Sequence, residues 1–166
     1  NFDKIIDRSG SGDLKHGALL PRWGREDLLP LWVADMDFET PSFITDALKA
    51  RLEHSLFGYT VEPEDFMPSV IDWIHDHHQW DVKREWIKFI PGIVKGIGLV
   101  VNVFTNPDEK VIIQPPVYHP FRLTPEGNGR EVVFNPLKMR DDGYYDMDFE
   151  NLEKVCDEKC KVFILC

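Results

Sequence analysis

The second half of the sequence alternates short apolar segments with segments of helical periodicity, and this alternation limits the folds that the chain can adopt. The expected strands span residues 86–90, 111–114, 131–134 and 161–166. One helix is expected over residues 93–105, and a second follows the turn at 115–120 and runs as far as Thr124. A third is expected to begin after Asp148, which acts as its N-cap. Strands that are separated by helices pair in parallel through crossover connections. The pattern therefore predicts an α/β fold with a mostly parallel sheet that is covered on both faces.

The first half of the sequence carries no such alternation. Residues 1–30 are rich in turn formers, which predicts an extended arm with room for one short helical piece. Thr40 as N-cap and Pro41 as the first helical residue predict a helix over 41–55, and apolar periodicity predicts another over 64–79. The predicted parts are an N-terminal arm and rim segment at 1–40, a helical segment at 41–85, and the first part of an α/β domain at 86–166.

The charge of the chain limits its partners. The 166 residues include 19 Lys and Arg against 29 Asp and Glu, a formal net charge of −10. Nucleic acids and anionic membranes require basic patches, so neither is expected as a partner. No apolar run approaches the roughly 18 residues that a membrane-spanning helix requires. The three cysteines predict reduced thiols and a cytoplasmic protein.

Two further features bear on metals and on completeness. His75 and His78 share a helix face, but histidines near a helix C-terminus are commonly solvated, so no metal site is predicted. The last expected strand runs to Cys166. Because ligands in parallel α/β sheets bind just beyond the carboxyl ends of strands, the chain is expected to be a fragment of a longer protein.

Several motifs allow both a functional and a structural interpretation when only their residue types and positions are considered. The turn at 90–96 joins a strand to a helix through glycine, so the amides there either bind a phosphate or bind nothing. Tyr118 lies in a stiff proline-rich turn, where its ring either fills the core or stacks on a planar cofactor. Tyr59 is either a half-buried loop aromatic or a hydroxyl donor to an anion. Lys95 is interpreted as a solvated lysine on a helix face.

The segment W32-V-A-D-M-D-F38 alternates apolar and acidic residues. Burying such a segment requires partners for two carboxylates, Asp35 and Asp37, so it is expected to line the rim of a site.

Four segments together resemble a known family: 29–38, 57–60, 90–96 and 113–121. They are similar to those of the fold-type-I enzymes that use pyridoxal 5′-phosphate (PLP), and specifically to the C–S β-lyases of the MalY/PatB class. The resemblance runs over essentially the whole chain. It departs in the arm, where the class often has Trp-Asp and this chain has His16-Gly17. The implied fold is the first part of the PLP-dependent transferase fold, truncated.

The resemblance also implies site residues. The backbone amides of Ile93 and Val94 would hold the PLP phosphate, and Tyr118 would stack on the pyridine ring. The backbone of Val33 and Ala34 would line the region of the substrate carboxylate. Tyr59 would reach the phosphate in the partner subunit of a homodimer with shared active sites. The Schiff-base lysine and the other catalytic residues of the family belong to segments after Cys166, so no catalytic residue is expected in this chain.

The function implied by the resemblance is α,β-elimination from an amino-acid substrate, cystathionine or another cysteine S-conjugate, which gives a thiol, pyruvate and ammonia. The fragment alone is expected to be inactive. A PLP-dependent aminotransferase is an alternative, since nothing in the sequence separates elimination from transamination. A non-catalytic binding or interaction module is the other alternative, if the chain is naturally this short.

Overall fold

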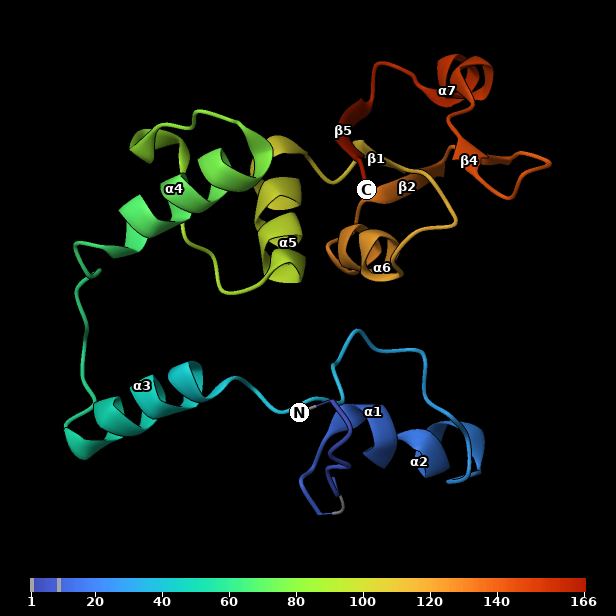
Figure 1. Cartoon of the computed structure of the whole chain (residues 1–166). Coiled ribbons are helices and arrows are strands. Elements are labelled where there is room, and N and C mark those ends of the chain that lie inside the picture. Colours follow the sequence, from blue (N-terminus) through green and yellow to red (C-terminus); the bar gives the residue numbers. More distant parts are fainter. Residues whose placement is uncertain (1, 9) are drawn as a thin grey trace. The chain divides into compact units, whose positions relative to one another are not determined.

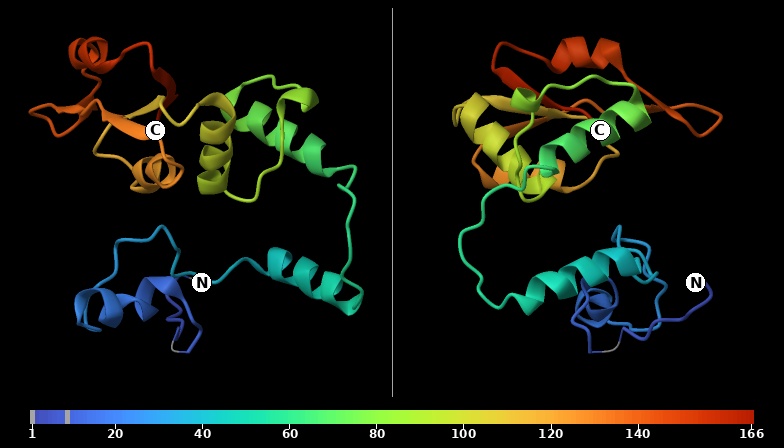
Figure 2. Two further views of the ribbon diagram at one scale, coloured as in Figure 1. Left: turned by 180° about the vertical axis from the view of Figure 1, so that it is seen from behind. Right: turned by 60° about the vertical axis from the view of Figure 1, so that its left-hand side comes forward.

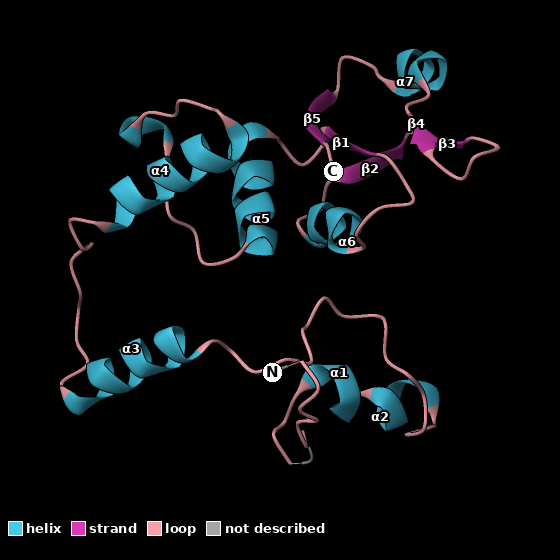
Figure 3. Ribbon diagram, viewed as in Figure 1, coloured by secondary structure: helices cyan, strands magenta, loops and turns pink. Residues whose placement is uncertain are grey.

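A computed structural model describes residues 2–8 and 10–166 of the chain; Asn1 and Ser9, in the predicted arm, lie outside the described residues. The chain divides into two compact units, residues 1–62 and 63–166. Figure 1 shows both units with most of their elements labelled, and Figure 3 shows how much of the first unit is loop. The part boundaries predicted at residues 40 and 85 stay a prediction.

The first unit contains three helices among its described residues: α1 (Leu14–Gly17), α2 (Leu19–Trp23) and α3 (Ser42–Glu53). The N-cap of α1 is Asp13, whose carboxylate accepts a hydrogen bond from the His16 amide at 2.9 Å. Gly24 is the C-cap residue of α2, and its positive φ of 70° suits a residue without a Cβ atom. The arm therefore holds two short helices where the sequence predicted room for one.

α3 begins one residue later than predicted, because Pro41 occupies the N-cap position itself and Thr40 stays outside the helix. Pro41 has a φ of −52° and an extended ψ of 141°, which is a capping conformation and not a helical one. The helix also ends at Glu53, two residues before the predicted end at Ser55.

The second unit carries the predicted sheet. Its elements are α4 (Phe66–His78), the 3₁₀ helix η1 (Arg84–Trp86), α5 (Ile93–Phe104), β1 (Lys110–Ile113), α6 (Pro120–Gly127), β2 (Glu131–Phe134), β3 (Lys138–Met139), β4 (Tyr145–Asp146), α7 (Phe149–Val155) and β5 (Cys160–Ile164). The strand order is β2-β1-β5, and both pairings are parallel, with Ile113 level with Phe134 on one side and Ile164 on the other. The α/β class and the parallel sheet are confirmed.

The central strand β1 is apolar on both of its faces. Val111, Ile112 and Ile113 are buried, and Val101 of α5 and Phe121 of α6 join them in the core. The crossover through α6 leads from β1 to β2, whereas the crossover through α7 leads back past β1 to β5. Right-handed crossovers in opposite directions place their helices on opposite faces. Figures 1 and 2 show α6 and α7 on opposite sides of the sheet.

The predicted strand at 86–90 is wrong. Arg84–Trp86 form a 3₁₀ turn, and residues 87–90 form neither helix nor strand. The apolar side chains of this segment pack on helices instead of joining a ladder: the Phe89 ring meets the Phe66 ring of α4 edge-on, with centroids 6.0 Å apart, and Ile90 lies under Gly96 of α5. The sequence of a short apolar run does not show whether the run joins a sheet or packs on helices.

The hairpin of β3 and β4 was not predicted. Its two antiparallel strands are joined by a turn at Asp141-Asp142-Gly143, where Gly143 has a φ of 84°. An Asp-Gly pair between short strands is a known hairpin signal, but each of these strands has only two residues. The hairpin is followed by Asp148, which caps α7 as predicted by accepting from the Asn151 amide at 3.0 Å.

Candidate functional site

The N-terminus of α5 presents unpaired backbone donors. The first hydrogen bond of the helix runs from the Gly96 amide to the Gly92 carbonyl at 3.1 Å, so the amides of Ile93, Val94 and Lys95 have no acceptor within the helix. No side chain caps this end, and Gly92 has a φ of 104°, a conformation that side chains rarely allow. Free amides and the positive end of the helix dipole together favour an anion at this position.

α5 and α6 run side by side in the same direction. A Cβ atom on Gly98 would lie 3.5 Å from Thr124, and the Asn102 side-chain amide donates to Asn128 at 2.7 Å. Both pairs are 26 residues apart, as expected for parallel helices in contact. One helical turn before Gly98 lies Val94, and the same spacing of 26 residues pairs it with Pro120. The first turn of α5 is therefore level with the first turn of α6.

Tyr118 lies at this same end, between the carboxyl end of β1 and the start of α6. Its backbone carbonyl accepts from the Phe121 amide at 3.0 Å. The Phe121 and His119 rings touch it edge-on, with centroids 6.0 Å and 5.1 Å away, and 54% of the residue is exposed. Tyr118 is therefore not a core plug, and its ring is available to a planar ligand.

Buried amides hold the turn that carries Tyr118. The Gln114 side chain donates to the Asn135 side chain at 2.7 Å, and Asn135 donates onward to the Asp148 carbonyl at 3.0 Å. The Leu137 amide donates to the Pro115 carbonyl at 2.8 Å, and the peptide bond between Pro115 and Pro116 is cis. The carboxyl edge of the sheet thus combines fixed backbone with an accessible aromatic ring beside free amides, an arrangement that suits a phosphorylated planar ligand.

The predicted rim segment at 32–38 is held by cations of the arm. The Arg8 guanidinium contacts the Asp35 carboxylate at 2.6 Å and the Asp37 carboxylate at 3.1 Å. The Lys15 ammonium donates to Asp37 at 2.7 Å and to the Asp35 backbone carbonyl at 2.8 Å. The Lys15 hydrogen bond lowers the pKa of Asp37, and Arg8 adds to this effect. The expectation that both carboxylates need partners is met by residues that the sequence analysis did not single out.

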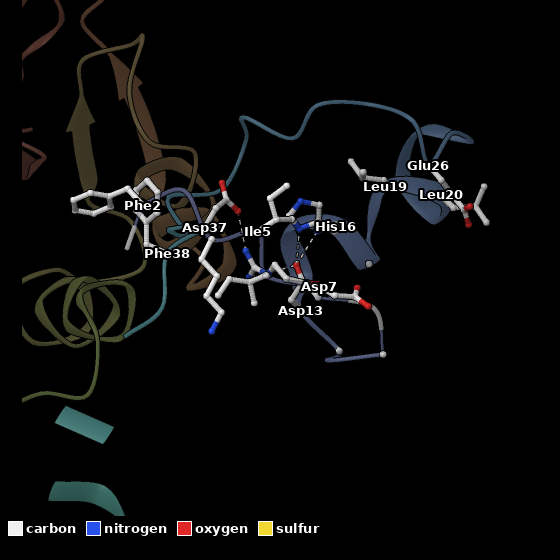
Figure 4. Close-up of a pocket in the computed structure, with 16 residues that line it drawn as sticks. Phe2, Ile5, Asp7, Asp13, His16, Leu19, Leu20, Glu26, Asp37 and Phe38 are labelled. Atoms are coloured by element: carbon white, nitrogen blue, oxygen red, sulfur yellow. Dashed lines mark hydrogen bonds and ion pairs between the residues drawn. The ribbon is translucent and has the colours of Figure 1, made fainter. Parts of the chain in front are cut away.

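Val33 and Ala34 directly precede Asp35, whose backbone and side chain are held in this way. Val33 is half-buried, Ala34 is exposed, and the Asp35 amide donates to the Val33 carbonyl at 2.9 Å. An open pocket of about 930 Å³ lies in the same unit. Figure 4 shows Asp37, Phe38 and the Asp13–His16 pair among the residues that line this pocket. Val33 and Ala34 are not among the residues that line it.

Tyr59 lies in the first unit, in residues 54–62, which form no helix or strand, and its side chain is fully exposed. It is therefore not the half-buried loop aromatic of the first reading. Ile93, Val94 and Tyr118 belong to the second unit, and the structure groups only these three at one place. No group of three or more potential ligands that could hold a metal occurs among residues 2–8 and 10–166. No helix in the described part of the chain is long and apolar enough to cross a bilayer.

Comparisons with known proteins define the class. The family model "Aminotransferase class I and II" matches residues 26–166, and the chain belongs to this family. The chain is 45% identical over 167 residues to cystathionine beta-lyase PatB of Bacillus subtilis, covering 100% of this chain and 43% of that protein.

Solved structures agree with this family. A PLP-bound aminotransferase-like protein of Clostridium difficile superposes with a TM-score of 0.92 at 40% identity, over 100% of this chain and 43% of its own. Cystalysin of Treponema denticola, which contains PLP, superposes with a TM-score of 0.89 at 34% identity, over 98% of this chain and 42% of its own. The chain thus spans about 43% of the length of the curated relatives with which it aligns in full.

Proposed function

We propose that the whole protein is a PLP-dependent C–S β-lyase. The reaction takes a cysteine S-conjugate such as L-cystathionine and water, breaks the Cβ–S bond, and gives one thiol, one pyruvate and one ammonium ion. The observation that carries the proposal is the grouping of the free α5 amides with the exposed ring of Tyr118. The 45% identity to cystathionine beta-lyase PatB supports this choice of reaction.

The residues at the carboxyl edge of the sheet fit the proposed cofactor. The amides of Ile93 and Val94 donate to its phosphate, where the dipole of α5 favours the negative charge. The Tyr118 ring packs against its planar face. PLP supplies the electron withdrawal that makes the Cα–H bond of the substrate acidic.

The first unit contributes to the substrate and to assembly. The backbone of Val33 and Ala34 lines the region of the substrate carboxylate. Tyr59, fully exposed in its loop, donates its hydroxyl to the phosphate bound by the partner subunit of a homodimer. No residue of this chain serves as the Schiff-base lysine: Lys95, the lysine nearest the free amides, is exposed in the first turn of α5. The acidic charge and three free thiols suit a protein of the cytoplasm that binds neither nucleic acid nor membrane.

The experiment assays the full-length protein with PLP and L-cystathionine. Thiol, pyruvate and ammonia are measured together, and their release in equal amounts, with no 2-oxo acid added to the assay, supports elimination. Transamination is the second candidate, favoured by the match to the aminotransferase family model. It would show as amino transfer that depends on an added 2-oxo acid and releases no ammonia. Absence of thiol release in both conditions would refute the lyase proposal.

The shared active site is tested by complementation. A full-length Tyr59→Phe variant is mixed with a full-length variant that lacks the Schiff-base lysine, and the subunits are allowed to exchange. One site of each hybrid dimer then carries both lesions and the other carries none, so activity should rise above that of both parents. If mass measurements confirm exchange and activity does not recover, Tyr59 does not act across the dimer.

A further inference from the structure

Among the described residues of the first unit, Lys15 is the only charged residue that is buried, with 6% of its surface exposed. Lysine is almost never fully buried unless it is paired, because removing an ammonium from water is costly. Two of its three donors are used on one short segment, on the carboxylate of Asp37 at 2.7 Å and on the backbone carbonyl of Asp35 at 2.8 Å. The hydrogen bond to the Asp35 carbonyl holds the main chain of this segment, so the ammonium does more than neutralise a carboxylate.

The backbone of the same residue holds the other end of that segment. The Trp32 indole N–H donates to the Lys15 carbonyl at 3.1 Å. The Trp32 ring also meets the Trp23 ring of α2 edge-on at 5.2 Å, which fixes its orientation. Lys15 therefore contacts the residues on both sides of the dipeptide Val33-Ala34, Trp32 through its carbonyl and Asp35 through its ammonium.

Arg8 adds a second connection between the arm and the segment. Its guanidinium spans the two carboxylates of Asp35 and Asp37, with contacts of 2.6 Å and 3.1 Å. These pairs hold the acidic side chains, whereas the Lys15 ammonium also binds the main chain, at the Asp35 carbonyl. The conformation of Val33-Ala34 thus depends more directly on Lys15 than on Arg8.

We infer that Lys15 is a positioning residue for the amino-acid substrate: it fixes the backbone of Val33 and Ala34 in the conformation that receives the substrate's α-carboxylate. The inference rests on the proposed function, which assigns that region to the carboxylate. Lys15 itself does not touch the substrate. A purely structural ammonium would affect stability alone, whereas a positioning residue changes how well the protein distinguishes a carboxylate from a neutral group.

The experiment uses full-length protein loaded with PLP and compares wild type, Lys15→Met and Lys49→Met. The Met side chain keeps the length of the apolar stem and removes the ammonium. Lys49 is the matched control, because it is exposed on α3 and pairs there with Asp46 at 3.1 Å. The probes are L-alanine and L-alaninamide, which differ in the carboxylate, and their dissociation constants are measured by calorimetry. Hydrogen exchange of the amides at 33–37 reports the backbone directly.

Lys15→Met should weaken L-alanine binding about tenfold or more, since small displacements of positioning groups cost one to two orders of magnitude. It should leave L-alaninamide binding within about twofold and speed exchange at 33–37, and Lys49→Met should change neither. Equal weakening of both probes, unchanged binding of both, or unchanged exchange would overturn the inference. If Lys15→Met does not fold, Trp32→Phe, which removes the indole N–H that bonds to the Lys15 carbonyl and keeps an aromatic ring beside Trp23, must show the same selective loss.

Failure of the proposed function is a separate result. It appears as wild-type protein that releases no thiol from L-cystathionine. The comparison of L-alanine with L-alaninamide requires binding and not turnover, so it still decides whether Lys15 positions the carboxylate region.

Discussion

Replacing Asn135 by Ala should destabilise the second unit strongly, although the change removes only a small polar group. Asn135 has no exposed surface. Its side chain accepts from Gln114 at 2.7 Å and donates to the Asp148 carbonyl at 3.0 Å. In the Ala variant, the buried Gln114 amide loses its partner, whereas the Asp148 carbonyl loses one of two donors and still accepts from the Leu152 amide at 2.9 Å.

The magnitude follows from one orphaned donor and one further lost hydrogen bond. A buried donor or acceptor that loses its partner costs about 1–3 kcal/mol. The lost bond to the Asp148 carbonyl adds about 0.5–1.5 kcal/mol, the net value of one hydrogen bond, and a water molecule that enters the vacated space can satisfy part of the demand of the Gln114 amide. We therefore expect a loss of about 3 kcal/mol in the free energy of unfolding.

The assay is urea denaturation followed by circular dichroism, with a lower midpoint at an unchanged m-value as the expected result. Asn102→Ala is the matched control: its side-chain amide also makes two hydrogen bonds, to the Gly98 carbonyl at 2.9 Å and to Asn128 at 2.7 Å, but it is exposed. Water replaces those bonds, so the control should lose about 0.5 kcal/mol. An equal loss in both variants, or a loss below about 1 kcal/mol for Asn135→Ala, would refute the reasoning.

The remaining predictions concern the cofactor region and the cap of α7. Ile93→Pro should weaken PLP binding about tenfold, because it removes one amide donor. The helix should tolerate the change, since proline suits the first helical position and Gly92 already has the extended ψ of 140° that precedes proline. The control Ile93→Ala keeps the donor and should bind PLP normally by equilibrium titration. Tyr118→Ala should weaken PLP binding about fivefold, the equivalent of about 1 kcal/mol, and Tyr118→Phe should retain most of the affinity; an equal loss in both would assign the effect to the hydroxyl. The hydrogen bond from the Asn151 amide lowers the pKa of Asp148 in the folded protein. The stabilisation that the ionised carboxylate gives is therefore complete above the ordinary aspartate pKa of about 3.9, and it is lost as the pH falls through the lower folded pKa. Asp148→Asn still caps the helix, so denaturation measured at a series of pH values should show a smaller fall of stability across that acid range.

The sequence predicted the second unit well where local signals and burial agree. The strand at 131–134 was predicted at its observed bounds, and Asp148 caps α7 as its side chain and position suggested. In both cases a turn signal and an apolar pattern indicate the same element. The predicted strand at 86–90 failed because its apolar run has no neighbouring strand to pair with, and only tertiary contacts determine whether such a run joins a sheet or packs on a helix.

The candidate site was predictable in part. The glycine before α5 and the prolines around Tyr118 are visible as local motifs, and the structure brings these two motifs to the same edge of the sheet. Lys15 and Arg8 were not visible in the same way, because each is an ordinary basic residue in an arm of turn formers. A signal for them did exist: Asp35 and Asp37 demanded cationic partners, and that demand could have directed attention to the basic residues of the preceding arm.

α5 shows why sequence predicts the identity of an element better than its surroundings. Its residues are apolar on nearly every side, a pattern typical of a helix that is covered all round. Within this chain α6 and the sheet cover one side, where Val101 is buried, while Ile93, Leu99, Val103 and Phe104 remain exposed. The apolar pattern of α5 indicates how much of its surface must be covered. It does not indicate which residues cover that surface, because these belong to the segments that pack against the helix. The donors at its first turn need no such partner, which is why the proposed phosphate site can be argued from α5 alone.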